Sequence, residues 1–153
     1  MISRANTRNR LRASSGQNIV EFALVAMIFF FVSFSIIDFS YLFFVKLTLQ
    51  NAVRQAGRYA ITGQSMDGHS RHDSIMQTVQ RTSLGLATSA NTTVCSAGGG
   101  CSSGGGPGDT VTVTVSYRYR CLTPFVAAFF TDGTYTIRES SSFKNEPFPP
   151  GQT

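Results

Sequence analysis

The stretch SSGQNIVEFALVAMIFFFV, residues 14–32, decides the fold because it opens a long apolar run. From Phe22 to Val45 the only charged residue is Asp38, and Lys46 closes the run after 24 residues. A helix needs about 20 apolar residues to cross about 30 Å of hydrocarbon. The sequence therefore predicts a single membrane-spanning helix at about residues 20–45.

The charge is concentrated before this run. The formal net charge is +5, but four of the thirteen basic residues are arginines that precede Gly16, and the first twenty residues contain no acid. Nine basic and eight acidic residues remain after Gly16, without the basic cluster that a nucleic-acid surface requires. The positive-inside rule predicts a cytoplasmic N-terminus, with everything after Lys46 outside the cytoplasmic membrane.

The remaining pattern predicts an α+β fold: a long N-terminal membrane-spanning helix that extends into a small periplasmic head. Apolar residues from Leu49 to Ala60 recur at helical spacing, so the helix continues beyond the membrane to a stop at Gly63. The head should contain a second helix and a short antiparallel sheet. The expected parts are an unfolded basic leader (1–16), the long helix (17–63, regular from about Asn18), and the head (64–153), with a helix at about 70–86 and strands at about 90–94, 110–119 and 134–143.

The three cysteines, Cys95, Cys101 and Cys121, all lie in the exported part. A disulfide is the default outside the cytoplasm, and an odd number leaves one cysteine over. Cys95–Cys101 is the favoured pair because both flank one short flexible loop, and closing it would stabilise the head by roughly 2 kcal/mol. Cys121 is then either free or paired between subunits. The spacing fits no common zinc pattern, so no metal or cofactor is expected.

Gly16 and Glu21 carry the most specific motif. A secretory signal peptide would have a shorter apolar core and a cleavage site after it, which this sequence lacks. Gly16, Glu21 and Phe22 instead resemble the prepilin cleavage motif of type IV pilins, in its tight-adherence (Flp) form. The resemblance implies that a membrane peptidase cuts between Gly16 and Gln17, leaving Glu21 as the fifth residue. The plainer reading of Glu21 is an acid at the headgroup level near a helix N-terminus.

The resemblance extends to the TadE-like family of minor pseudopilins. Asp38-Phe39 resembles a second acid-aromatic pair of that family, and LQNAVRQAGRYA (residues 49–60) resembles the stretch that follows it there. Residues 111–130 resemble the family's strand followed by a Leu-Thr-Pro element. Ser40-Tyr41 and Cys121 depart from the family pattern. Asp38 is either an acid at the outer membrane boundary or a helix-packing contact, and both readings stay open.

The resemblance implies a minor pilin or pseudopilin of the tight-adherence type IVb pilus, acting in pilus assembly, priming or adhesion. Its partners would be a prepilin peptidase, other pilin or pseudopilin subunits, the assembly platform and membrane lipid, with no nucleic acid. It would be single-pass in the inner membrane, with a periplasmic or extracellular head, or incorporated in the pilus. Glu21 would neutralise the new amine of Gln17 in its own chain or a neighbour.

Two other functions remain as alternatives. An uncleaved single-span protein could carry a periplasmic head that binds a partner, in which case Glu21 is dispensable. A membrane-tethered hydrolase or metal enzyme would have to use His69 and His72, the only histidines, and no third ligand is suggested. The sequence therefore predicts a protein that is not an enzyme.

Overall fold

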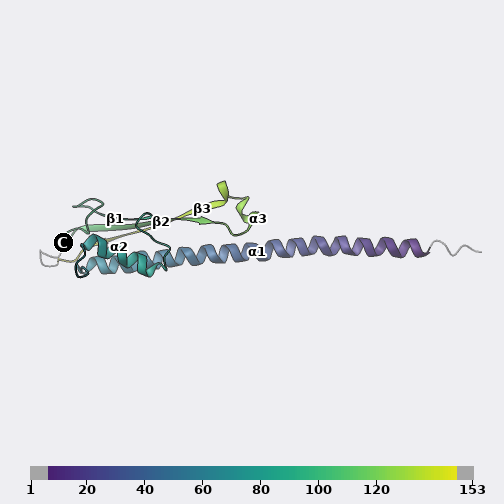
Figure 1. The fold of residues 1–153 in the computed structure, drawn as a ribbon, viewed down its shortest axis with the longest axis horizontal. Helices are drawn as coiled ribbons and strands as arrows, with labels where there is room; N and C mark the ends of the chain where they lie inside the picture. Colours follow the sequence, from purple (N-terminus) through teal and green to yellow (C-terminus); the bar gives the residue numbers. More distant parts are fainter. Residues whose placement is uncertain (1–6, 148–153) are drawn as a thin grey trace, which may run out of the picture.

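The computed structural model describes the backbone of residues 7–147 and the side chains of residues 16–147. One long helix, α1 (Thr7–Ile61), forms a stalk, and all other elements lie along its C-terminal half (Figure 1). The predicted α+β fold, with a long apolar helix, a further helix and an antiparallel sheet, is confirmed.

The two ends of α1 compare differently with the prediction. The helix begins at Thr7 and not near Asn18, so residues 7–16 are helical where an unfolded leader was expected; residues 1–6 lie outside the described residues. Arginine, leucine and alanine are good helix formers, and one glycine costs only about 1 kcal/mol, so Gly16 does not stop the helix. At the other end, Gly63 has a φ of 69° and its N–H bonds the carbonyl of Ala60 at 3.3 Å. This glycine ends the helix, as predicted.

The core lies between α1 and the sheet. The predicted apolar stripe of α1 is buried throughout, and it meets every second residue of the central strand. Alternation of β-branched and small polar residues places the valines of that strand on one face. The buried residues are Leu49, Ala52, Val53, Ala56 and Ala60 of the helix and Val111, Val113 and Val115 of the strand.

The sheet has three antiparallel strands in the order β1-β2-β3. They are β1 (Thr92–Ser96), β2 (Thr110–Arg120) and β3 (Thr134–Lys144), within two residues of the predicted segments. In the register, Val113 lies opposite Val94 on one side and Ser141 on the other. The inner face is covered by α1 and by the second helix, so the head packs directly on the stalk (Figure 1).

Helix α2 (Arg71–Thr82) is shorter than predicted. Ile75 and Val79 are buried against the core as expected, but Leu84 has a φ of 55° and is exposed. Gly85 follows with a φ of 82°, so the chain leaves the helix before the predicted end at Leu86. Glycine accepts this left-handed conformation at low cost, so Gly85 was the residue in the sequence that indicated an end of α2 before Leu86.

A short helix, α3 (Pro124–Ala127), and a 3₁₀ turn, η1 (Thr131–Gly133), join β2 to β3. Proline at the first position of α3 suits a helix start because its missing N–H would have no partner there. The β2–β3 hairpin reaches along the stalk, and α3 lies beside the middle of α1 (Figure 1).

Candidate functional site

The motif around Gly16 lies on the part of α1 that the head does not cover. Gly16, Gln17, Glu21 and Phe22 are all exposed. Among the residues whose side chains the structure describes, no atom beyond the chain neighbours and the local helix backbone lies within 4 Å of the position that a Cβ would take at Gly16. The segment is therefore accessible, and opening the helix there breaks no packing between described side chains.

Gln17 and Glu21 are four residues apart, so they share one face of α1 with an axial separation of about 6 Å. Among the residues that the structure describes, Glu21 has no hydrogen-bond or ion-pair partner. An unpartnered carboxylate at the mouth of an apolar helix is costly in lipid. Its partner has to come from a free amine, from the headgroups or from another chain.

Asp38 is the site that the sequence left open, and it is only 2% exposed. Its Oδ1 accepts hydrogen bonds from Leu122 N at 2.8 Å and Tyr119 Oη at 3.0 Å. Its Oδ2 accepts from Thr123 N at 3.1 Å and from the Thr123 hydroxyl. The carboxylate thus ties the end of β2 to the stalk, so Asp38 is an intramolecular anchor of the head.

Two groups beside this anchor titrate abnormally. Burial raises the pKa of Tyr119, and the hydrogen bond to the Asp38 carboxylate raises it further, because both favour the neutral phenol. Burial also raises the pKa of the Cys121 thiol, with the Asp38 charge adding to the effect. Cys121 is a buried free cysteine, and its thiol is held in the unreactive protonated form.

Cys95 and Cys101 form a disulfide, which is the pair favoured from the sequence. It closes the loop that follows β1, and the strand bonds of that loop include Ser96 N to the Gly100 carbonyl at 2.8 Å. The bridge lies at the end of the sheet away from Asp38, because Ser96 pairs with Val111 at the start of β2. It therefore stabilises the head rather than the anchor.

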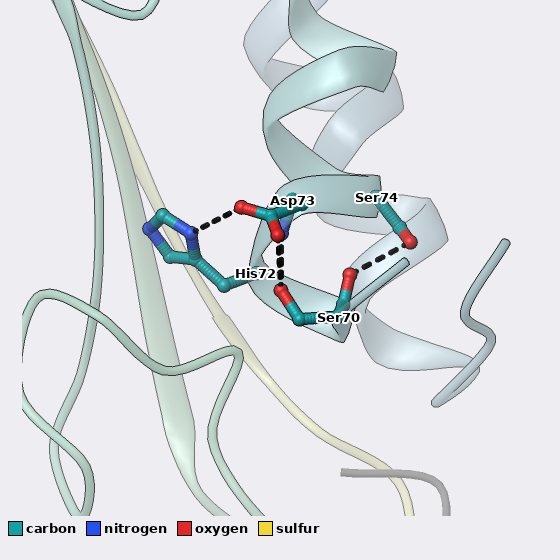
Figure 2. A network of polar contacts seen from close by, with 4 residues as sticks. All are labelled: Ser70, His72, Asp73 and Ser74. Carbon is teal, nitrogen blue, oxygen red and sulfur yellow. Dashed lines mark hydrogen bonds and ion pairs between the residues drawn. The ribbon is translucent and has the colours of Figure 1, made fainter. Parts of the chain in front are cut away.

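Ser70, which lies between His69 and His72, is the N-cap of α2 (Figure 2). Asp73 N donates to Ser70 Oγ at 3.1 Å, and the Ser70 hydroxyl donates to Asp73 Oδ2 at 2.7 Å. His72 Nδ1 lies 3.3 Å from Asp73 Oδ1. The Ser70 hydrogen bond, followed by that to His72, lowers the pKa of Asp73. In the described part of the chain, no three potential ligands come together to hold a metal ion.

Arg71 is a structural residue that the sequence analysis did not identify. It is 2% exposed, and its guanidinium donates to the carbonyls of Ala60 and Gly105. Burial lowers its pKa, and the charge of Asp109 opposes that shift. A cation at the C-terminal end of α1 is favourable to the helix dipole. Arg71 thus joins α1, α2 and the glycine-rich loop. In the sequence, its place directly after Ser70, the N-cap of α2, was the one indication of this role.

Most of the stalk matches a known family. The family model for TadE-like proteins matches residues 16–58. The chain carries a TadE-like domain. No curated protein and no solved structure matches the chain.

The TadE-like domain begins at Gly16 and ends at Arg58, so it contains both Glu21 and Asp38. The partners of Asp38, which are Tyr119, Leu122 and Thr123, lie beyond it. The sequence signal for them was the Leu-Thr-Pro element after the strand. A TadE-like domain indicates a protein associated with the tight-adherence pilus, and its one apolar helix, unburied by the rest of the described chain, fits a single-pass membrane protein.

Proposed function

We propose that the chain is a minor pseudopilin of the tight-adherence pilus, made as a precursor and cut between Gly16 and Gln17 by a prepilin peptidase. The observation that carries the proposal is the exposed Gly16–Phe22 segment at the start of the TadE-like domain, clear of the head. The role is structural and not catalytic. The basic residues before Gly16 keep the N-terminus cytoplasmic, and the head is periplasmic.

Cleavage requires α1 to open around Gly16. Glycine lowers helix stability by about 1 kcal/mol relative to alanine, so it marks the weakest point of this segment. No described side chain packs on Gly16, so opening does not disturb the head, whose contacts begin further along α1. A peptidase at the cytoplasmic face can therefore process the chain after the head has folded.

The mature helix has two features suited to assembly with other pilin-like helices. Most of the exposed side chains from Phe22 to Phe44 are large and apolar, and lateral packing would bury them. Glu21 would then pair with the Gln17 amine of its own chain or a neighbour. An ionised group in the apolar layer is costly and seeks a partner, so pairing with the amine is favoured at the mouth of the span and would fix the axial register.

The test is the N-terminus of the protein recovered from native membranes, read by intact mass and terminal sequencing. We expect a chain that starts at Gln17. Gly16→Val should leave residues 1–16 attached, while the control Ala26→Val, on the same exposed helix, should be processed normally. Normal maturation of Gly16→Val would refute the proposal. Loss of processing would not be explained by misfolding, because no described side chain contacts the site of the substitution.

Glu21→Gln separates assembly from processing. We expect the variant to be cut, to insert, and to fail to co-purify with other pilus subunits. Glu139→Gln, in the head, is the matched control and should assemble. Assembly of Glu21→Gln at the wild-type level would contradict the register role and leave the cleavage step standing.

One observation favours the alternative of an uncleaved anchor. The helix is continuous from Thr7 through Gly16, so the backbone is not already extended at the cleavage point. A chain that starts at Met1 in cells with the peptidase would establish this alternative. The protein would then be a membrane-tethered head that binds a partner.

A further inference from the structure

The segment that joins β2 to β3 has the composition of a lipid-facing element. Residues 122–130, here named the hairpin tip, read LTPFVAAFF and contain no charged residue. Leu122, Phe125 and Phe129 are 61%, 54% and 78% exposed. Exposed apolar side chains gathered in this way mark a surface that is covered in the working protein.

The hairpin tip lies level with the membrane-spanning part of α1. The rings of Phe125 and Phe31 are in edge contact, with centroids 6.1 Å apart. Phe31 is seven residues before Asp38, or about 10 Å nearer the cytoplasm. The predicted span at about residues 20–45 contains Phe31, and so does a shorter span of about 20 residues that starts near Gln17 and ends close to Asp38. Phe125 is therefore inside the hydrocarbon layer, provided that α1 spans the membrane as proposed.

Backbone hydrogen bonding in the tip suits a site without water. Seven of the nine N–H groups from Cys121 to Phe130 have acceptors: two bond Asp38, and the others bond carbonyls of the tip and of Gly133. The N–H groups of Phe125 and Val126, in the first turn of α3, have no acceptor among the described residues. Pro124 has no N–H to satisfy. Non-helical backbone is tolerated at membrane depth only where its polar groups are paired in this way.

The flanks and the groove beside the tip also indicate lipid. The exposed charged residues Arg120 and Asp132 stand on either side of the uncharged segment, as at the edge of an apolar layer. Between the tip and α1 is an open groove of about 530 Å³ with an almost wholly apolar lining. It is lined by Met27, Ile28, Phe30, Phe31, Phe34 and Phe125.

We propose that the hairpin tip inserts into the outer leaflet of the membrane and that lipid acyl chains cover Leu122, Phe125 and Phe129. The head is then attached to the bilayer at two points, by the span and by the tip. The continuity of the tip with the exposed apolar surface of α1 argues for lipid as the occupant, because the same layer that covers Phe31 covers Phe125.

The chain contains no tryptophan, so single tryptophans report the environment without background. Three variants of the full-length protein are compared in phosphatidylcholine vesicles at low protein-to-lipid ratio, with and without bromine on the acyl chains. Phe129→Trp probes the tip and Phe29→Trp probes the span. Lys144→Trp is the water-exposed control, because Lys144 lies at the other end of β3, about 33 Å from the tip.

We expect Phe129→Trp to show blue-shifted emission and a loss of intensity with brominated lipid similar to that of Phe29→Trp, while Lys144→Trp shows neither. Behaviour of Phe129→Trp like that of Lys144→Trp, with Phe29→Trp quenched, would overturn the inference and leave the span intact. Blue-shifted emission without quenching would also overturn it, because a second protein chain would then cover the tip. Absence of quenching at Phe29→Trp would refute the membrane span itself.

Discussion

Replacing Asp38 by asparagine should release the end of β2 from the stalk. Each carboxylate oxygen accepts one backbone N–H, Oδ1 from Leu122 and Oδ2 from Thr123. Asparagine has one oxygen and one NH₂ group, so in either orientation a backbone N–H faces a donor. Hydroxyl groups can rotate to other acceptors, but these two N–H groups cannot.

The expected cost follows from the number of backbone groups left without an acceptor. One such group costs about 1–3 kcal/mol, so Asp38→Asn should destabilise the attachment by that amount. Asp38→Ala leaves both groups without an acceptor and should cost roughly 2–6 kcal/mol on the same basis. These values are a large part of the roughly 5–15 kcal/mol that stabilises an ordinary domain.

The assay is amide hydrogen exchange of the full chain in lipid nanodiscs, together with thermal unfolding. Protection of Leu122 and Thr123 should fall roughly 5- to 150-fold in Asp38→Asn. Asp67→Asn is the matched control, because the exposed Asp67 makes no hydrogen bond through its side chain. Lipid over the tip would also slow exchange, so the anchor would be refuted by unchanged protection at both amides together with an unchanged melting temperature in Asp38→Asn.

Three further predictions concern the head. Gly57→Ala would place a Cβ 1.9 Å from the Phe143 ring. The overpacking cost of about 1–3 kcal/mol should exceed the gain in helix propensity of about 1 kcal/mol and lower the melting temperature. The double variant Gly57→Ala, Phe143→Leu should recover part of the lost stability. Reduction of Cys95–Cys101 should cost roughly 2 kcal/mol in denaturant unfolding, and an unchanged midpoint would show that the loop is ordered without the bridge. The raised pKa of Tyr119 keeps its phenol protonated in the folded state while the unfolded chain ionises, so this residue's contribution to stability should decline as the pH rises above 10.0. An absorbance titration of the folded protein should show a late-ionising phenol that Tyr119→Phe removes, and a titration curve without such a step would contradict the burial of this phenol.

The sequence predicted the elements that depend on local periodicity. The stripe from Leu49 to Ala60 has helical spacing, and the alternation from Thr110 to Tyr119 has strand spacing, so each element identified its own buried face. The stop at Gly63 followed from one residue type. These features need no knowledge of which element packs on which.

The anchor could not be predicted in the same way. Asp38 and Leu122 are 84 residues apart, and neither has a local pattern that indicates the other. An acid near the end of a membrane span has an ordinary explanation at the headgroup level, and it competes with any specific contact. The Leu-Thr-Pro element after β2 was visible, but its role depends on two backbone N–H groups that no side-chain pattern reports.

The anchor also determines how the proposed pseudopilin can move. The head is attached along the core stripe of α1 and again at Asp38, so it has no hinge between these levels and follows the stalk as one body. Glu21 and Asp38 are 17 residues apart, which fixes an axial separation of about 25 Å along one helix. An axial register set at Glu21 by a neighbouring amine would therefore set the height of the head and of the hairpin tip. If the tip is held in the outer leaflet, extraction of the subunit from the membrane has to withdraw the tip and the span together, and loosening Asp38 should uncouple the two.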